Sequence, residues 1–303
     1  MADERLIVAL DFHTADDAKK LVEELGNDVN FYKVGMELFY SVGAEIIHWL
    51  KARDKKIFLD LKLHDIPNTV AGGLCSLMNL GADILNLHAA GGFTMMKTAA
   101  DALHNEAERR GVKCPKLIAI TVLTSIGQAE WFGARDIPAQ VADFAKLAKD
   151  AGLDGVVASP KEAKLIRDTC GENFLIVTPG IRPAGASVDD QSRIATPAAA
   201  LQNGATHLVI GRPIRAAKNP RDAAQKIWLE MGDMTSFLRF FIYFYRKNNI
   251  TTVYYRIPLI KGRSPDPRRV PVRRCRFWPA QGSHSRPASA GMRRSWTGLP
   301  LSR

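Results

Sequence analysis

The chain is organised around one stretch of ten residues, which reads Asp60-Leu61-Lys62-Leu63-His64-Asp65-Ile66-Pro67-Asn68-Thr69. It follows the apolar run Ile57-Phe58-Leu59, which predicts a buried strand. Because residues two apart in a strand point to the same face, Asp60 and Lys62 share one face near the carboxyl end of that strand. A buried strand carries an alternating acid and base when the two charges are paired. The stretch therefore indicates a charged site at the end of a strand.

An Asp-x-Lys pair alone is more often a structural ion pair than a functional site, because surface ion pairs are common and weak. Three further features favour a functional site here. Asp65 adds a third charge, residues 66–69 (Ile-Pro-Asn-Thr) predict a rigid turn, and Lys33 ends the preceding predicted strand. We interpret the four charged residues as one constellation.

Residues 1–231 alternate between predicted strands and predicted helices. Eight strands are predicted. Seven are apolar runs at residues 6–10, 31–34, 84–88, 117–123, 155–158, 175–178 and 207–210, and the third in order is the segment that runs from Ile57 through Asp60 and Lys62. Eight strand–helix units of this even length predict a TIM (β/α)8 barrel. A doubly wound open sheet is the main alternative, but no GxGxxG motif follows the first strand, so a dinucleotide site is not expected.

Several helix starts carry capping signals. Thr14 offers an N-cap for a helix that ends near Gly26, and residues 159–162 (Ser-Pro-Lys-Glu) combine a cap, a proline and an acid. One helix is expected between the second strand and about Ala52. The remaining starts are expected at Gly91-Gly92, near Pro138, at Thr196-Pro197 and near Pro220, where the last helix runs to Met231.

Polar residues stand where the predicted strands end, and in a TIM barrel the active site lies at this end. They are Asp11, Lys33, Asp60, Lys62, His88, Thr124 and Arg212. Any one of them could be a helix cap or a solvated strand end. Together they converge on one rim of the predicted barrel, which indicates a site.

A phosphate site is expected after the seventh and eighth strands, where TIM barrels often bind phosphate. The seventh strand is followed by residues 179–182 (Pro-Gly-Ile-Arg) and a polar loop through Gln191. The eighth is followed by Gly211-Arg212-Pro213, in which glycine permits close backbone approach and Arg212 can bind phosphate in a bidentate manner.

Residues 60–69 resemble the signature of the orotidine 5′-phosphate decarboxylase family, whose members form UMP and CO2 from orotidine monophosphate in the last step of de novo UMP synthesis. Three further segments match the family: residues 179–182, residues 190–193 (Asp-Gln-Ser-Arg) and residues 211–213. The resemblance covers residues 1–231. It implies a homodimeric, cytoplasmic enzyme that needs neither a cofactor nor a metal.

The resemblance also implies a role for individual residues. Lys62 is the proton donor, flanked by Asp60 and by Asp65 of the neighbouring subunit, and Thr69 reaches across the same interface to the ribose. Asp11 and Lys33 hold the ribose hydroxyls, and Thr124 contacts the pyrimidine. Arg182 and Gln191 belong to a loop that closes over the nucleotide, while Gly211 and Arg212 bind the phosphate.

Two other functions remain open. Magnesium-dependent sugar-phosphate decarboxylases and aldolases on related barrels share an Asp-x-Lys-x-x-Asp core, although residues 66–69 and the Gln191 loop favour the orotidine family. A second possibility is a non-catalytic phosphate-binding barrel that a basic tail tethers to nucleic acid.

The charge of the chain is unevenly distributed. Of its 42 Lys and Arg and 31 Asp and Glu, fifteen basic residues and two acids lie in residues 232–303, which leaves 27 and 29 in residues 1–231. The tail is rich in Arg, Pro, Ser and Gly, which predicts disorder. A basic tail can bind nucleic acid, but we favour an unselected extension, such as a frameshift would produce.

The remaining composition predicts a protein of a reduced compartment. The four cysteines are scattered without a CxxC pair, so neither a zinc site nor a disulfide framework is expected. The amino terminus lacks the pattern of a signal peptide, and no apolar run is long enough to span a membrane. These features predict a cytoplasmic protein without a membrane partner.

Overall fold

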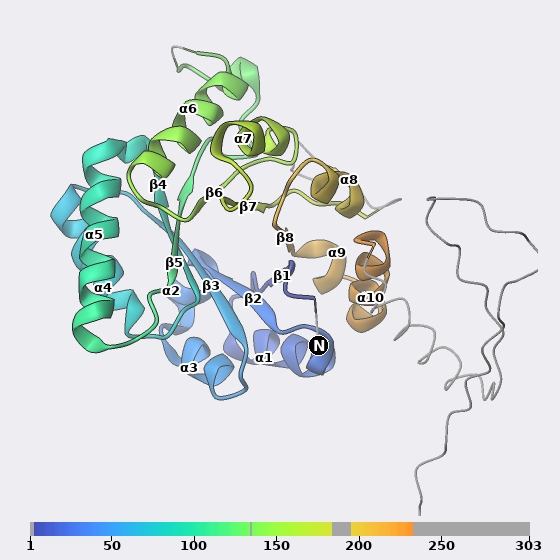
Figure 1. Ribbon diagram of the computed structural model, residues 1–303. Helices are drawn as coiled ribbons and strands as arrows, with labels where there is room; N and C mark the ends of the chain where they lie inside the picture. Colours follow the sequence, from blue (N-terminus) through green and yellow to red (C-terminus); the bar gives the residue numbers. More distant parts are fainter. Residues whose placement is uncertain (1–2, 134, 184–194, 233–303) are drawn as a thin grey trace, which may run out of the picture. The chain divides into compact units, whose positions relative to one another are not determined.

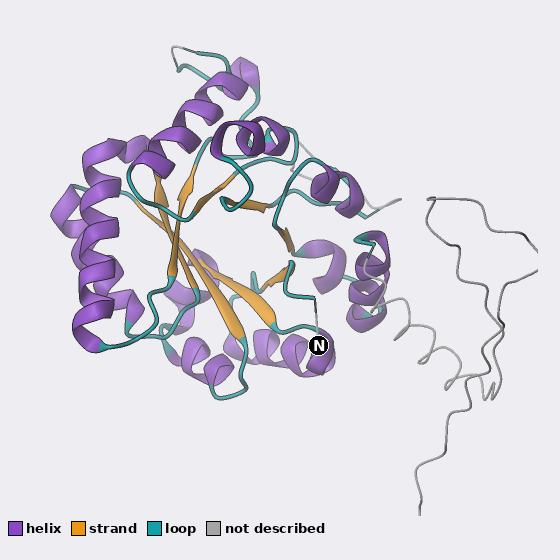
Figure 2. Ribbon diagram, in the orientation of Figure 1, coloured by secondary structure: helices purple, strands orange, loops and turns teal. Residues whose placement is uncertain are grey.

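A computed structural model describes residues 3–133, 135–183 and 195–232 of the chain. Its strands form a closed parallel barrel in sequential order, with helices around it (Figures 1 and 2). The strands are β1 (Leu6–Ala9), β2 (Phe31–Gly35), β3 (Lys56–Leu63), β4 (Ile84–His88), β5 (Lys116–Ile120), β6 (Gly155–Val157), β7 (Leu175–Thr178) and β8 (His207–Ile210). The barrel closes because β1 also pairs with β8, with Leu6 opposite Leu208. The prediction of a TIM barrel is confirmed, and the open sheet is wrong.

Helices alternate with the strands along the chain. In the part that the structure describes, they are α1 (Ala15–Leu25), α2 (Met36–Val42), α3 (Glu45–Lys51), α4 (Pro67–Met78), α5 (Gly92–Arg110), α6 (Ile137–Asp150), α7 (Ala163–Cys170), α8 (Pro197–Gln202), α9 (Arg212–Arg215) and α10 (Pro220–Glu230). Three short 3-10 helices join them, at Gly26–Asp28, Ala89–Gly91 and Gln128–Glu130. Thr14 and Thr196 cap α1 and α8 through their side chains, as the sequence predicts.

Three predicted boundaries are wrong, and so is the turn expected at residues 66–69, because Pro67 begins α4. The helix expected between β2 and Ala52 is two helices, because Gly43 takes a positive φ of 65° and ends α2. The fifth strand ends at Ile120, three residues before the apolar run does. α7 begins at Ala163, because residues 160–162 form a turn instead of the first helical residues.

The core has two parts, one inside the barrel and one between the strands and the helices. The inner part is a layer of apolar side chains from six strands: Ile7, Phe31, Phe58, Ile84, Ile118 and Val177. The larger outer part includes the alternate residues of the same strands, such as Val8, Tyr32 and Leu85. Because of this alternation, a residue two positions after an inner residue also faces the inside of the barrel. It lies one layer closer to the carboxyl end of the strands.

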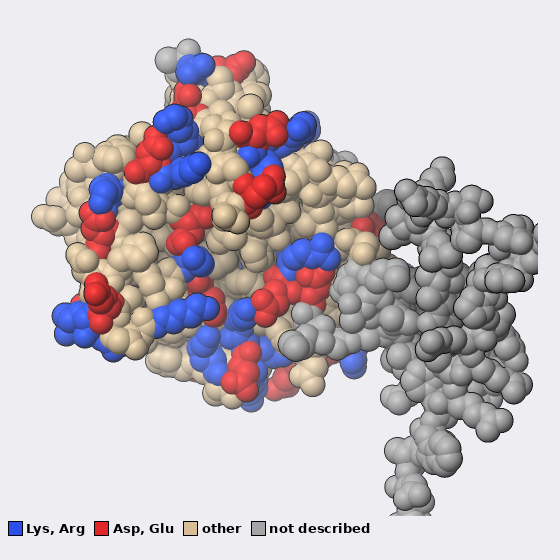
Figure 3. All heavy atoms as spheres, in the orientation of Figure 1, with Lys and Arg blue, Asp and Glu red and all other residues tan. Residues whose placement is uncertain are grey.

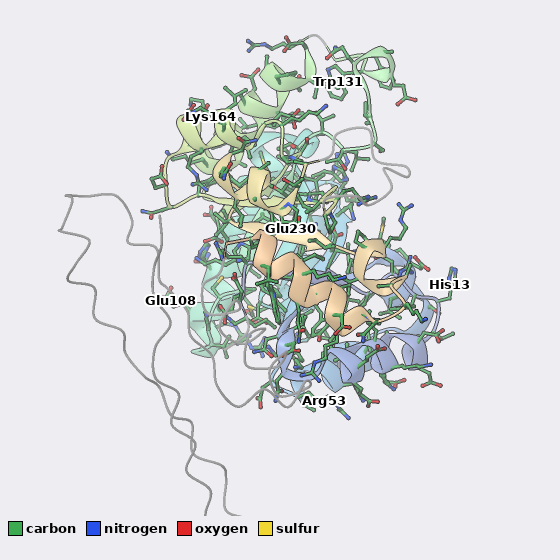
Figure 4. The ribbon with its side chains drawn as sticks, turned by 90° about the vertical axis from the view of Figure 1, so that its right-hand side faces the viewer. His13, Arg53, Glu108, Trp131, Lys164 and Glu230 are labelled. Carbon is green, nitrogen blue, oxygen red and sulfur yellow. The ribbon has the colours of Figure 1, made fainter. Side chains whose placement is uncertain are left out.

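Two views show the outside of the barrel. His13, which follows β1, and Glu108, which precedes β5, lie at opposite ends (Figure 4), as expected when all strands run in parallel. On the face seen in Figure 3, acidic and basic side chains are interspersed. In the described ranges, no helix combines the length and hydropathy that a membrane crossing requires.

Candidate active site

A cavity of about 250 Å³ opens at the carboxyl ends of the strands. Its floor is apolar and includes Phe58 and Ile120. Eight of the predicted site residues line it: Asp11, Lys33, Asp60, Lys62, Thr124, Arg182, Gly211 and Arg212. They come from the ends of β1, β2, β3, β5, β7 and β8, so the barrel brings together residues as far apart in the chain as Asp11 and Arg212.

Four charged side chains form a row of alternating sign across one side of this cavity. Lys33 Nζ lies 2.8 Å from Asp11 Oδ1 and 3.5 Å from Asp60 Oδ2. Lys62 Nζ lies 2.8 Å from the other oxygen of the same carboxylate, Asp60 Oδ1. The side chain of Lys62 is 24% exposed and that of Lys33 is 11% exposed, so Lys62 is the more open ammonium of the row.

The strand periodicity explains why the two middle members of the row, Lys33 and Asp60, meet. Lys33 and Asp60 each stand two residues after an inner core residue, Phe31 and Phe58, and therefore form the layer above the apolar floor. Gly35 follows Lys33 by two more residues, and a Cβ atom there would lie 2.7 Å from Lys33 Nζ. The missing side chain at this position leaves room for the ammonium.

Lys62 does not follow the regular strand. Its φ of 55° is left-handed, a conformation that costs a residue with a side chain about 1–2 kcal/mol. The pairing of β3 with β4 shifts at this point, since Leu59 pairs with Leu85 but Leu63 pairs with Leu87. β3 therefore bulges at residues 60–62, and the bulge aims Lys62 at Asp60.

Asn86 is a member of the site that sequence reasoning missed. It lies opposite the bulge, 1% exposed, and its Nδ2 donates a hydrogen bond of 2.6 Å to Asp60 Oδ1. Its Oδ1 accepts a hydrogen bond of 2.8 Å from the backbone N–H of Lys62. A signal existed: Asn86 is a polar residue two positions after the inner core residue Ile84, in an otherwise apolar strand.

Asp60 and Lys33, the two buried members of the row, favour their charged forms because neighbouring charges offset the cost of burial. Burial opposes the ionised form of Asp60, but Lys33, Lys62 and the hydrogen bonds from Lys62 and Asn86 outweigh it and lower the pKa of the carboxyl group. Burial also opposes charge on Lys33, yet Asp60 and Asp11 raise the pKa of its ammonium. The site therefore presents fixed charges of both signs to a ligand.

His88 lies beside this row and does not line the cavity, contrary to its expected place on the rim. Its ring centroid is 5.4 Å from that of His64, which follows β3. Burial lowers the pKa of His88, and His64 and Lys62 lower it further. A neutral imidazole therefore stands next to Lys62 near pH 7.

The predicted anion-binding residues lie after β7 and β8, beside the Asp11 end of the row. Gly211 follows β8, and a Cβ atom on it would come within 3.4 Å of the Cβ atom of Ala9. Arg212 is the first residue of α9 and lines the cavity directly. Arg182 is 8% exposed and donates a hydrogen bond of 3.1 Å to the carbonyl of Ile181. Two arginines and an open backbone segment thus face the same space.

Three further predicted residues are not placed in this cavity. Asp65 and Thr69 are exposed, on the segment after β3 and on the first turn of α4, and neither lines the cavity of its own chain. Asp65 Oδ1 accepts a hydrogen bond of 2.7 Å from the N–H of Ile66. Gln191 lies outside the described residues. Among the residues that are described, no group of three or more His, Cys, Asp or Glu side chains is arranged to hold a metal ion.

The sequence model of the orotidine 5′-phosphate decarboxylase / HUMPS family matches residues 4–227. The chain belongs to this family. Among curated family members, the orotidine 5′-phosphate decarboxylase of Moorella thermoacetica is 48% identical over 234 residues, which cover 76% of this chain and 93% of that protein. The enzyme of the same name from Carboxydothermus hydrogenoformans is 52% identical, with 75% and 96% covered.

A solved structure of a family member has the same fold. The crystal structure of the orotidine 5′-phosphate decarboxylase from Lactobacillus acidophilus superposes with a TM-score of 0.67 at 42% sequence identity. The match covers 76% of this chain and 100% of that one. The resemblance of the chain to this family is therefore confirmed at the level of both sequence and fold.

Proposed function

We propose that this protein decarboxylates orotidine 5′-phosphate to UMP and CO2, with Lys62 as the proton donor. The observation that carries the proposal is the row Asp11, Lys33, Asp60 and Lys62 along one cavity. The curated relatives at 44–52% identity that bear the name of this enzyme support the reaction itself.

The reaction needs a fixed positive charge. Loss of CO2 from the pyrimidine leaves an electron pair on C6, which is a vinylic carbanion. The ammonium of Lys62 stabilises this negative charge as it develops and then transfers a proton to C6. The proton forms the C6–H bond of UMP, and the electron pair of the broken C–C bond becomes that bond. Lys62 regains its proton from water.

Asp60 has two effects in this scheme. It holds the ammonium of Lys62 at 2.8 Å, so the proton donor is in place before the substrate arrives. The negative charge of Asp60 also faces the substrate carboxylate and repels it. This repulsion disappears as CO2 leaves. Lys33 keeps Asp60 ionised both before and after CO2 leaves, because its ammonium faces the second oxygen of the Asp60 carboxylate.

The other lining residues hold the nucleotide. We assign Asp11 and Lys33 to the ribose hydroxyls, Thr124 to the pyrimidine, and Gly211 and Arg212 to the phosphate. Arg182 lines the same cavity and is assigned with Gln191 to a loop that closes over the nucleotide. The phosphate contacts are remote from C6, so their binding energy can position the base and favour closure.

Asp65 and Thr69 are assigned to the site of a neighbouring subunit. They are exposed and do not line the cavity of their own chain, which is compatible with donation to the site of a partner. The functional unit is then a homodimer with two shared sites. We also place the enzyme in the cytoplasm, since de novo UMP synthesis uses soluble intermediates.

The magnesium-dependent alternative has less support. The family description also covers hexulose-phosphate enzymes, so the family alone does not decide between them. Asp60, however, already accepts hydrogen bonds from Lys62 and Asn86 and faces Lys33, which leaves it poorly suited as a metal ligand. A non-catalytic barrel with a nucleic-acid-binding tail does not explain the charged row, and that tail lies outside the described residues.

The proposal is tested by following the ultraviolet absorbance of orotidine 5′-phosphate in the presence of EDTA, with the full chain and with residues 1–231. Turnover by both proteins supports a metal-free decarboxylase and a catalytic domain that ends near residue 231. Turnover that requires added magnesium, or turnover of a hexulose phosphate instead, contradicts the proposal. Activity of the shorter protein alone would show that residues 232–303 are inhibitory.

A further inference from the structure

The carboxamide of Asn86 joins the two central residues of the site without lining the cavity. One end, Nδ2, donates to the Asp60 carboxylate at 2.6 Å, and the other end, Oδ1, accepts from the Lys62 backbone at 2.8 Å. The side chain is 1% exposed and comes from a different strand, β4. Asn86 is therefore a link between the carboxylate and the backbone that carries the ammonium.

The need for this link arises from the bulge in β3. Between the pairs Leu59–Leu85 and Leu63–Leu87, residues 60–62 lie opposite a single residue, Asn86. The regular exchange of backbone hydrogen bonds stops there, and Lys62 takes its left-handed φ of 55°. In a regular strand, a backbone carbonyl of the neighbouring strand would accept from the Lys62 N–H. Here the Asn86 side chain supplies that acceptor instead.

The same carboxamide fixes the orientation of Asp60. Asp60 Oδ1 accepts from both Lys62 Nζ and Asn86 Nδ2, while Oδ2 faces Lys33. Asn86 contributes a donor without a charge, so it holds the carboxylate and leaves the charge balance of the row unchanged. An apolar residue here would leave Asp60 held only by the two lysine side chains, which are longer and have more rotamers than a carboxamide.

We infer that Asn86 is a positioning residue for the decarboxylation, which aims the Lys62 ammonium at the cavity by clamping both Asp60 and the Lys62 backbone. This inference rests on the proposed function. It differs from the assignment of residues that contact the substrate, because Asn86 acts only through its two partners.

A purely structural role is the competing explanation, since any buried carboxamide needs hydrogen-bond partners. The two roles differ in what they change. A structural role affects folding, whereas a positioning role lowers kcat and leaves substrate binding nearly intact, because the nucleotide is held largely by residues of other strands.

The decisive variant is Asn86→Leu, which keeps the side-chain volume approximately and removes both hydrogen bonds. Its kcat for orotidine 5′-phosphate is expected to fall about 100-fold, since a small misplacement of a reacting group has an effect of this size. KM and the affinity for UMP are expected to change less than about threefold. The matched control is Ile84→Val, which removes one methyl group from the apolar layer beneath Asn86 on the same strand and should leave kcat unchanged.

A second variant, Asn86→Asp, separates the donor from the acceptor. When protonated, its carboxyl group can donate to Asp60 and accept from Lys62 as the carboxamide does; when ionised, it repels Asp60. The charged and titratable groups around this position are Lys33 on β2, Asp60 and Lys62 on β3, His64 after β3 and His88 on β4. The activity of this variant relative to wild type is expected to rise as the pH is lowered, while that of Asn86→Leu stays constant.

Each outcome decides one question. A folded Asn86→Leu protein with kcat within about twofold of wild type overturns the positioning role, as does a loss confined to KM. A flat pH profile for Asn86→Asp relative to wild type overturns the role of the Nδ2 donor, and this variant also serves if Asn86→Leu does not fold. Wild-type protein without turnover overturns the proposed function and the positioning role together.

Discussion

The ammonium of Lys62 lies 2.8 Å from Oδ1 of Asp60, although the two residues belong to the same strand and only Leu61 separates them. A left-handed backbone at Lys62 accompanies this contact. The proton donor and the carboxylate that orients it therefore form one local unit in β3. Lys33 and Asn86 hold that unit from the two neighbouring strands.

Replacement of Lys33 by Met is expected to lower kcat at least about 100-fold and to move the acid limb of its pH profile to higher pH. Asp60 has a lowered pKa partly because Lys33 faces it. Without that cation the pKa rises, so Asp60 loses its charge at a higher pH than in wild type. The measurement is kcat against pH. Lys56→Met removes an exposed ammonium at the other end of β3 and should leave the profile unchanged.

Replacement of Arg212 by Ala is expected to weaken UMP binding by about 1.5–3 kcal/mol, the size of a hydrogen bond to a charged group. Calorimetric titration with UMP measures this loss directly, and KM should rise in parallel. Arg215→Ala is the matched control: Arg215 ends the same short helix, lies over the ring of Phe12 and does not line the cavity. Equal affinities for UMP in wild type and Arg212→Ala would contradict the phosphate assignment.

The shared site predicts complementation between inactive variants. Lys62→Ala and Asp65→Ala should each lose most activity, but a mixed dimer contains one site with both residues intact. After subunit exchange, half of the dimers are mixed and half of their sites are intact, so the mixture should recover about a quarter of wild-type activity.

The control for complementation is a mixture of Lys62→Ala with Asp60→Ala. These two residues serve the same site of the same chain, so no mixed dimer has an intact site. Recovery in this control, or no recovery in the Asp65 mixture, would contradict the assignment of Asp65 to the neighbouring subunit.

His207 is expected to make the fold less stable in mild acid. Burial lowers its pKa below the ordinary value of 6.5, and Lys56 lowers it further while Glu4 and Asp3 oppose this effect. Below about pH 6.5 the unfolded chain binds a proton that the folded protein does not, so the free energy of unfolding falls as the pH falls towards the lowered value. Urea unfolding of wild type and His207→Gln between about pH 7 and about pH 5 should show a smaller decline in the variant. Identical declines would contradict this role.

Much of this architecture could be predicted from the sequence, because a parallel barrel strand is an apolar run followed by polar residues. Asp11, Lys33, Asp60 and Arg212 line the cavity where that rule places them. Thr124 also lines the cavity, although β5 ends at Ile120 and not at residue 123 as predicted. The location of Thr124 was therefore predicted correctly even though the end of the strand was not.

The rest depended on interactions between strands, which a local pattern can point to, as the polar Asn86 in an apolar strand does, but cannot specify. The bulge at residues 60–62 and the φ of Lys62 follow from the pairing of β3 with β4, and the role of Asn86 follows from that bulge. His88 ends a strand as predicted but stacks near His64 outside the cavity. Asp65 and Thr69 are exposed and away from the cavity lining of their own chain, and Gln191 lies outside the part of the chain that the structure describes.

The most direct test of the central claim is the turnover of orotidine 5′-phosphate by Lys62→Ala, measured beside its affinity for UMP. Loss of both charge stabilisation and the proton donor should lower kcat by at least about a thousandfold. UMP should still bind measurably, because Asp11, Gly211 and Arg212 remain in place. Turnover near the wild-type rate in a variant that binds UMP would contradict the account of Lys62 as the catalytic group.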